Sequence, residues 1–297
     1  MLLPSKAMQL SLDLSIINAK PVYFNFSEVQ IYVIGCGGTG SYLVPSLCRI
    51  ANFLSPKGRD IKISLVDFDS VEEKNLYRQN FCLGEIGFNK AQALALRYKT
   101  LFPKLDIREV LATASQVKID STSPTIIITC VDNAKARGDV RELMIQHQSM
   151  YRHNFNQIPC WWIDCGNGYT YGQVAIGNYY TLEPEDYILE PATCIRLPLP
   201  TIQYPELMTQ IEEDENISCA ERAMLGGQSL NINSQIAITA AEMVRQLLDS
   251  KLKRMNVEID LLQGSMKSTW IAQEEIDKIL GRVELLADGR ESINNHT

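Results

Sequence analysis

Apolar and polar positions alternate along this 297-residue chain in blocks that favour strands and helices in turn. Short apolar runs at residues 30–35, 61–68 and 125–131 are rich in β-branched side chains, as strands buried on both faces are. Apolar residues at helical spacing predict helices over 41–53 and 89–102. Strand, helix and strand in this order predict a right-handed βαβ unit.

The second half of the chain continues the pattern of strands and helices, but with adjacent strands that favour antiparallel pairing. Residues 159–165 and 171–176 predict two strands, 231–252 a helix, and 257–271 a hairpin that turns at Gly264. We therefore expect an α/β fold: a doubly wound, Rossmann-like, mostly parallel sheet with an antiparallel second half.

The same pattern predicts the division of the chain. An N-terminal extension, 1–26, precedes one domain, 27–281, whose two halves are a nucleotide-binding part, 27–150, and a partner-binding part, 151–281. A proline-rich and acidic segment, 183–217, predicts a long crossover loop within the second half. The polar residues 282–297 predict a disordered tail.

Composition narrows the classes of function. A net charge of −7 without basic clusters argues against binding of nucleic acid. No run of eighteen apolar residues and no basic, apolar leader is present, so we expect no membrane contact and a cytoplasmic location. The eight cysteines include no C-x-x-C pair, which predicts no structural zinc.

A glycine cluster at the first strand-to-helix junction is the first candidate for chemistry. Gly35, Gly37, Gly38 and Gly40 form G-C-G-G-T-G, where backbone amides at a helix start can approach a phosphate. The alternative is a tight turn that needs glycine for packing alone. Asp67 closes the second strand, where it would meet a ribose hydroxyl. These two features alone would suggest a nicotinamide dehydrogenase.

The segment after the second strand changes this interpretation. It runs D-F-D-S-V-E-E-K-N-L-Y-R-Q and resembles the ThiF/MoeB/ubiquitin-activating superfamily, whose pattern is D-x-D-x-V-x-x-x-N-L-x-R-Q with a lysine opening the next helix. The matching positions are Asp67, Asp69, Val71, Asn75, Leu76, Arg78, Gln79 and Lys90. The alternative is that Arg78 and Lys90 are ordinary surface charges. The resemblance continues at Asp132-Asn133, after the strand 125–131.

The resemblance implies an activity and its residues. It implies adenylation of the C-terminal carboxylate of a small ubiquitin-like protein ending in glycine, followed by acyl transfer to a cysteine. It also implies a homodimer, with a transfer enzyme as a possible further partner. It implies ATP and Mg²⁺, with Asp132 as the metal ligand. The implied nucleotide-binding residues are Gly35, Gly37, Gly38, Gly40, Asp67, Asp69, Asn75, Arg78, Gln79, Lys90, Asp132 and Asn133, and the implied catalytic residues are Arg78, Lys90, Asp132 and Cys219.

Some of these assignments have alternatives. Asp132 could instead cap the following helix. Cys219 follows the crossover segment and precedes the helix 231–252, as the family's acceptor cysteine does, but it could be a bystander, with Cys194 as the rival nucleophile. The resemblance includes an N-terminal arginine that this sequence lacks before Gly35, so that contact is either missing or supplied from elsewhere, with Arg137 and Arg152 as candidates. A non-catalytic, nucleotide-binding adaptor and a nicotinamide oxidoreductase are the alternative functions.

Overall fold

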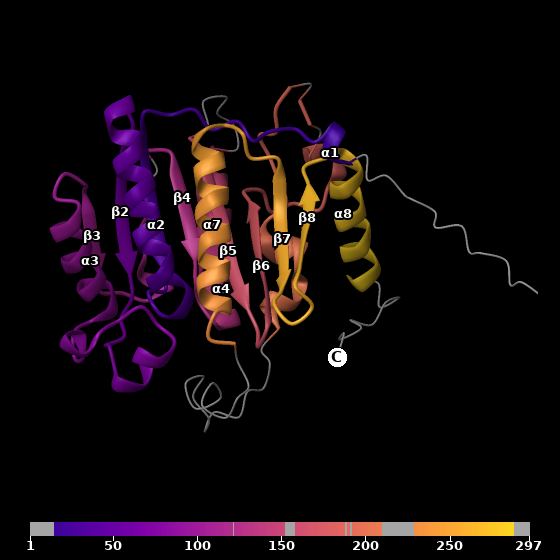
Figure 1. Cartoon of the computed structure of the whole chain (residues 1–297). Coiled ribbons are helices and arrows are strands. Elements are labelled where there is room, and N and C mark those ends of the chain that lie inside the picture. Colours follow the sequence, from indigo (N-terminus) through magenta and orange to yellow (C-terminus); the bar gives the residue numbers. More distant parts are fainter. Residues whose placement is uncertain are drawn as a thin grey trace, which may run out of the picture.

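A single sheet of eight strands organises the part of the chain that the computed structural model describes, residues 15–120, 122–151, 158–187, 189–190, 192–209 and 229–287. Its order is β3-β2-β1-β4-β5-β6-β7-β8 (Figure 1). The strands are β1 (Glu28–Ile34), β2 (Asp60–Val66), β3 (Ile107–Val110), β4 (Thr125–Thr129), β5 (Cys160–Asn167), β6 (Tyr171–Gly177), β7 (Arg254–Asp260) and β8 (Ser265–Trp270). The pairs from β3 to β5 are parallel and those from β5 to β8 antiparallel, which confirms the predicted mixed sheet.

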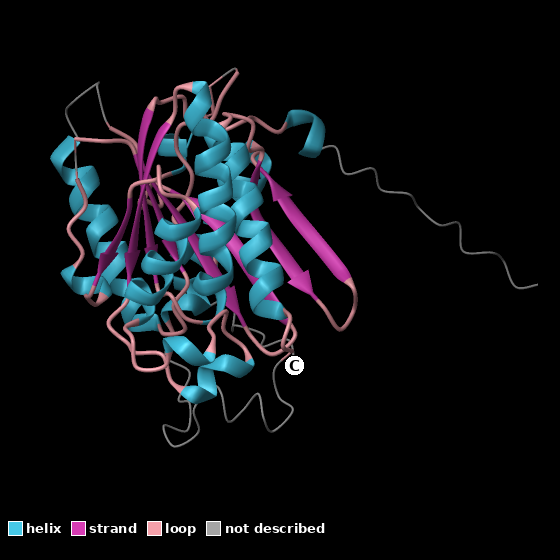
Figure 2. Cartoon of the chain, turned by 60° about the vertical axis from the view of Figure 1, so that its left-hand side comes forward, coloured by secondary structure: helices cyan, strands magenta, loops and turns pink. Residues whose placement is uncertain are grey.

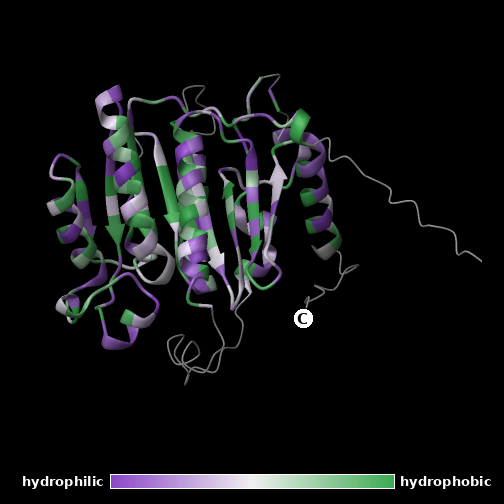
Figure 3. Cartoon of the chain, in the orientation of Figure 1, coloured by the Kyte–Doolittle hydropathy of each residue, from purple (hydrophilic) through white to green (hydrophobic). Residues whose placement is uncertain are grey.

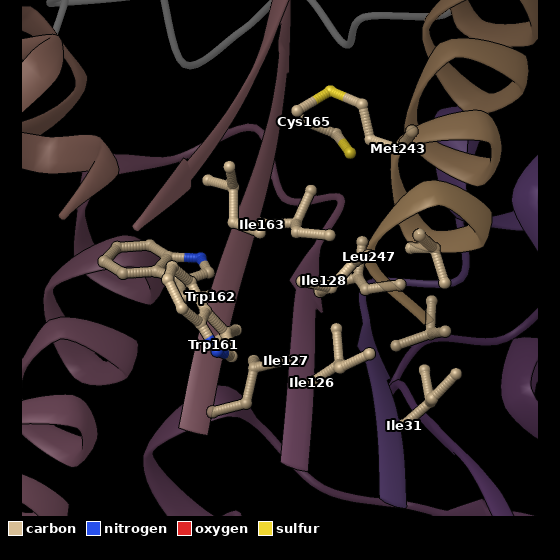
Figure 4. Close-up of a cluster of buried hydrophobic side chains, with 14 of the residues drawn as sticks. Ile31, Ile126, Ile127, Ile128, Trp161, Trp162, Ile163, Cys165, Met243 and Leu247 are labelled. Atoms are coloured by element: carbon tan, nitrogen blue, oxygen red, sulfur yellow. The ribbon is translucent and has the colours of Figure 1, made fainter. Parts of the chain in front are cut away.

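Helices cover both faces of this sheet (Figure 2). The α-helices of the described residues are α1 (Ser15–Asn18), α2 (Gly38–Leu54), α3 (Lys90–Leu101), α4 (Ala134–Tyr151), α5 (Pro200–Gln203), α7 (Ile232–Leu248) and α8 (Gln273–Ala287). Cys165 of β5 lies beside Met243 of α7 in Figure 4, whereas its neighbour Asp164 pairs with Arg137 of α4. Successive residues of a strand point to opposite faces, so α7 and α4 cover opposite faces of the sheet. None of the described helices combines the length and the apolar composition needed to span a bilayer.

The core lies on both faces of the sheet, and one part of it lies between the central strands and α7. Ile126, Ile128, Trp161 and Leu247 have almost no exposed surface, and Figure 4 shows Ile128 beside Leu247. In Figure 3 the central strand β4 is coloured as hydrophobic, while α8 at the edge of the molecule carries both colours. A strand with both faces covered is apolar along its length, which is why the run at 125–131 was recognisable in the sequence.

The order of the strands determines where a crevice opens at the edge of the sheet. After β1, the chain builds β2 and β3 on one side and then crosses to β4 on the other side of β1. Connections at the carboxyl ends of β1 and β4 therefore diverge, and a crevice opens between them. The segments predicted to bind a nucleotide follow β1, β2 and β4, and they all leave the sheet at this edge.

Pro45 removes one hydrogen bond of α2, and Asn80 of a neighbouring loop replaces it. The sequence predicted a helix from residue 41 with Pro45 in its first turn, but α2 begins at Gly38 and Pro45 lies inside it. Proline has no N–H, so the carbonyl of Ser41 loses its partner within the helix. Asn80 replaces that partner: its Nδ2 donates to the Ser41 carbonyl at 3.1 Å, and its backbone N–H donates to Ser41 Oγ at 2.9 Å. The loop that carries Arg78 is thereby anchored on α2.

The N-terminal segment is built into the domain from Ala19 onward. The sequence pattern predicts an extension up to residue 26, yet Val22 and Phe24 are fully buried. Backbone N–H groups of Lys20 and Val22 donate to the carbonyls of Ile271 and Leu252 in the second half. In Figure 1 this indigo segment runs along the edge of the sheet opposite the predicted site. Its burial depends on contacts more than two hundred residues away, which no local pattern reveals.

Two other segments differ from their predictions. The described part of the crossover segment, up to residue 209, adds short helical turns and no strand, as expected, but it packs Leu197, Leu199 and Ile202 into the core. At the C-terminus, α8 continues to Ala287, so the prediction of a disordered tail from residue 282 was wrong for its first residues. Ile276 and Leu280, one helical turn apart, are buried, and α8 packs against α5 and the 3₁₀ turn η5 (Pro184–Tyr187).

Candidate active site

A cavity of about 790 Å³ opens at the carboxyl edge of β1, β2 and β4. Its volume lies within the range of small-molecule sites, about 300–1,000 Å³. Most of the residues predicted from the sequence line it: Gly35, Gly37, Gly38, Asp67, Asp69, Asn75, Arg78, Gln79, Lys90, Asp132 and Asn133. Gly40 does not line it, and Cys219 lies outside the described residues. The fold thus brings together residues from three separate loops.

The glycine turn contains glycines of two kinds. At Gly35 φ is +91°, and an added Cβ would lie 2.7 Å from the Cys130 carbonyl oxygen. At Gly40 an added Cβ would lie 1.9 Å from the Gly35 carbonyl oxygen, so packing of α2 against β1 requires glycine there. An added Cβ at Gly37 would be at an ordinary 3.7 Å from Gln79 Nε2. Packing therefore explains Gly35 and Gly40 but not Gly37, whose bare backbone lines the cavity and is open to a close ligand.

Asp67 is a buried carboxylate fixed by backbone amides. It is 8% exposed, and its two oxygens accept from the N–H groups of Cys36 at 2.6 Å and of Asp69 at 2.8 Å. Burial raises the pKa of Asp67, while these amides and the Lys90 ammonium act in the opposite direction. The carboxylate lines the cavity at the end of β2, where it can accept hydrogen bonds from ligand hydroxyls.

Lys90 is held at the cavity by the start of α3. Asn89 caps this helix by accepting from the N–H of Gln92, and its Nδ2 donates to the carbonyls of Asp67 and Asp69. The Lys90 side chain is 10% exposed, and its Nζ lies 3.0 Å from Asp69 Oδ2. A long cationic side chain of ordinary surface type would be far more exposed, so this placement argues against the surface-charge alternative.

Arg78 and Asn75 come from the loop between β2 and α3. Asn75 is 6% exposed, and its Oδ1 accepts from the backbone N–H of Glu72 at 2.9 Å, which closes the short 3₁₀ turn η2 (Glu73–Tyr77). Arg78 follows that turn directly and is half-buried on the cavity wall. The turn and the anchor at Asn80 together aim this loop at the cavity.

Asp132 is not used as a helix cap. Asn133 takes that role, because its Oδ1 accepts from the N–H of Ala136 at 2.8 Å at the start of α4. The exposed Asp132 carboxylate lines the cavity, with Asn133 Nδ2 at 3.3 Å from its Oδ1. A carboxylate with most of its lone pairs available is the kind of ligand that Mg²⁺ takes beside phosphates.

Arg137 does not replace the missing N-terminal arginine. Its guanidinium is buried, with Nε 3.0 Å from Asp164 Oδ1 and Nη2 donating to the Val131 carbonyl at 2.9 Å. Asp164 is fully buried, so removing Arg137 from this pair would leave an uncompensated charge inside the protein. The prediction that Arg137 could serve a ligand was therefore wrong, and Arg152 lies outside the described residues.

The second half of the domain contributes cavity residues that the sequence did not predict. Asn167 is the last residue of β5, and Asn233 lies in the first turn of α7. The additional lining residues include Thr39, Phe68, Lys74, Thr113, Lys135, Asn167, Gly168, Tyr169 and Asn233. Thr39 belongs to the glycine motif, and Phe68 and Lys74 lie at variable positions of the segment 67–79; the others reach the cavity through the fold.

Comparison with known proteins shows the family to which the chain belongs. A model of the ThiF family matches residues 11–269, which is most of the chain. The chain is a member of the ThiF family. The solved structure of PaaA matches the fold of this ThiF-family chain with a TM-score of 0.52 over 82% of this chain and 73% of that one. At 15% identity the likeness shows the shared fold alone.

Two curated relatives share part of the chain. The tRNA threonylcarbamoyladenosine dehydratase 2 of Saccharomyces cerevisiae is 28% identical over 127 residues, 41% of this chain and 27% of that protein. The ubiquitin-like modifier-activating enzyme 5 of Drosophila willistoni is 27% identical over 139 residues, 42% of this chain and 32% of that protein. The matched segments thus make up less than a third of each relative.

Cys194, the rival candidate for the nucleophile, is not an activated thiol in this ThiF-family chain. Cys194 is fully buried, its Sγ lies 3.2 Å from the Arg196 carbonyl, and burial raises its pKa to about 12. Cys130 lines the cavity, but the neighbouring Cys165 thiol and burial raise its pKa well above the usual value. A thiol is nucleophilic as the thiolate, so neither is suited to attack at neutral pH. The prediction of Cys194 as the rival nucleophile was wrong.

The two kinds of glycine lead to opposite expected effects of the same substitution. Gly40→Ala should destabilise the fold by about 3 kcal/mol, because its Cβ has no space beside the Gly35 carbonyl. Gly37→Ala should change the free energy of unfolding by less than about 1 kcal/mol but weaken nucleotide binding. Denaturant unfolding and calorimetric titration with ATP measure the two effects. Equal ATP affinity in wild type and Gly37→Ala would show that nothing approaches this backbone.

Proposed function

We propose that this chain is an ATP-dependent activating enzyme that adenylates the C-terminal carboxylate of a small ubiquitin-like protein. The observation that carries the proposal is the convergence on one cavity of a glycine turn, two cations and a carboxylate from three loops. Gly37 leaves its backbone open, Arg78 and Lys90 supply positive charge, and Asp132 supplies a metal ligand. A triphosphate requires this combination of donors, whereas a dinucleotide with two phosphates in diester linkage needs fewer cations.

The residues of the cavity also fit a nucleotide through polar atoms that lack partners. Gln79 Oε1 and Asn233 Nδ2 are buried and have no hydrogen-bond partner within the described chain. Buried polar groups of native proteins are nearly always paired, so both are expected to meet a ligand or ordered water. Both side chains line the cavity. Mg²⁺, held by Asp132, would neutralise charge on the phosphate oxygens.

The proposed reaction needs alignment and charge stabilisation and no acid or base. The substrate carboxylate attacks the α-phosphorus of ATP, forming an acyl–phosphate bond while the bond to the β-phosphate breaks and pyrophosphate leaves with the electron pair. Negative charge grows on the departing pyrophosphate, where Arg78 and Lys90 can stabilise it. Asp67 would orient the ribose, and the low exposure of Lys90 keeps its charge in a poorly solvated place.

The choice of substrate rests on charge and on one relative. The name of the Drosophila relative states that it activates a ubiquitin-like modifier. The yeast relative is named for a tRNA nucleoside, but the net charge of −7 on the present chain disfavours a polyanionic substrate. We therefore favour a protein carboxylate, and we propose a homodimer as the assembly in which it is activated.

The central test is exchange of labelled pyrophosphate into ATP in the presence of a ubiquitin-like protein that ends in glycine. Lys90→Ala should lower the exchange rate about 100- to 1,000-fold, because one donor to the developing charge is lost. Lys99→Ala is the matched control, since Lys99 lies on the same helix and also pairs with a carboxylate, that of Glu109 at 2.8 Å. Arg78→Ala should behave as Lys90→Ala does. Full exchange by either variant would place the phosphate site elsewhere.

A second prediction concerns the metal and the choice of nucleotide. ATP with Mg²⁺ should raise the melting temperature of the wild type, because ligand binding to the folded state stabilises it. Asp132→Asn should remove the dependence on Mg²⁺, while Asn133 still caps α4. NAD should give no stabilisation. A shift with NAD as large as with ATP would revive the oxidoreductase hypothesis.

A third prediction separates acyl transfer from adenylation. In the transfer step the Cys219 thiolate would attack the acyl carbon, a thioester would form, and AMP would leave. Cys219→Ala should keep pyrophosphate exchange but lose the thiol-sensitive adduct with the substrate protein. Cys194→Ala is the control and should keep the adduct, because Cys194 is buried. If the wild type forms no adduct under trapping conditions, the reaction ends at the adenylate.

A further inference from the structure

Asn233 joins the two halves of the domain at the glycine turn. It is the second residue of α7, is 2% exposed and lines the cavity. Its Oδ1 accepts two hydrogen bonds, from Thr39 Oγ1 at 3.2 Å and from Asn167 Nδ2 at 2.6 Å. The acceptor side of this amide is therefore satisfied by one residue of the glycine turn and one residue that ends β5.

The donor side of the same amide is not satisfied. Asn233 Nδ2 is buried and has no hydrogen-bond partner within the described chain. The two bonds to Oδ1 fix the side-chain orientation, because a flipped amide would set its Nδ2 against the Nδ2 of Asn167. A buried donor held in place without an acceptor is unfavourable unless a ligand or water supplies the acceptor.

The surroundings of Asn233 indicate which kind of acceptor would pair with its Nδ2. An added Cβ on Gly38 would lie 2.8 Å from Asn233 Oδ1, so the amide is packed directly on the backbone at the start of α2. Helix starts attract anionic oxygens, and the cationic Lys90 and Arg78 line the same cavity. An anionic phosphate oxygen is the acceptor that this charge distribution favours.

We propose that Asn233 is a further nucleotide-positioning residue, whose side-chain amide donates a hydrogen bond to the triphosphate of bound ATP. The proposal rests on the proposed function and extends it to the second half of the domain. Because Asn233 contacts Thr39 and Asn167 at the same time, nucleotide bound at this amide touches both halves. α7 thereby takes part in holding the nucleotide.

Asn233→Asp tests the donor selectively. The carboxylate has the same shape and keeps an acceptor for Thr39 and Asn167, but it replaces the N–H donor by a negatively charged oxygen. Calorimetric titration of the full chain with MgATP should show at least tenfold weaker binding than in the wild type. Asn233→Ser, which is neutral and too short to reach, should weaken MgATP binding about tenfold.

Adenosine and a second asparagine provide the controls. Adenosine has no phosphate, so its affinity should change less than twofold in both Asn233 variants. Asn256 of β7 is also buried, at 4% exposure, and it donates to Gln203 Oε1 at 3.2 Å outside the cavity. Asn256→Asp thus places a carboxylate in an equally buried position, and its folded protein should bind MgATP as the wild type does.

Each outcome of this experiment decides the proposal. MgATP affinity within twofold of the wild type in Asn233→Asp would overturn it, and so would an equal loss for adenosine and MgATP, which would mean a general collapse of the cavity. Failure of the wild type itself to bind MgATP would instead contradict the proposed function. A loss confined to MgATP and to the Asn233 variants supports the assignment.

Discussion

The close approach of α2 to β1 is the constraint on which the site depends. The Gly35 carbonyl leaves no space for a Cβ at Gly40, and the Cys130 carbonyl leaves none at Gly35. With these contacts the helix start sits against the carboxyl ends of β1 and β4, where the strand order switches. The amides at this helix start therefore face the crevice that the divergent connections open. Asp67 is tied to this turn through the N–H of Cys36.

The neighbouring loops are fixed by hydrogen bonds between side chains and backbone groups. Asn80 satisfies the carbonyl that Pro45 leaves without a partner, and Asn89 both caps α3 and holds the carbonyls of Asp67 and Asp69. Such bonds order a loop without filling the cavity with side chains. Asp67 shows the cost of this arrangement, since burial raises its pKa against the effect of its amide partners. The site is thus preorganised, which favours binding and alignment of a charged ligand.

The glycine turn and Asp67 were recognisable from local sequence patterns, whereas Asn75, Arg78, Lys90 and Asp132 were predicted from the resemblance to the ThiF/MoeB/ubiquitin-activating superfamily. The glycine turn, Asp67 and the segment up to Lys90 lie within one stretch of the chain, so the spacing of their residues is visible in the sequence. Asn233 and Asn167 could not be found in this way, because α7 reaches the glycine turn only after the whole sheet has formed. The burial of Arg137 and Cys194 was missed for the same reason: a charge or a thiol carries no local sign of the partner that encloses it.

The account requires one bound geometry, which a crystal structure of the full chain with Mg²⁺ and a non-hydrolysable ATP analogue would test. We expect the phosphates between the glycine turn and the side chains of Arg78 and Lys90, with the ribose at Asp67. An analogue found outside this cavity, or phosphates directed away from the glycine turn, would contradict the account.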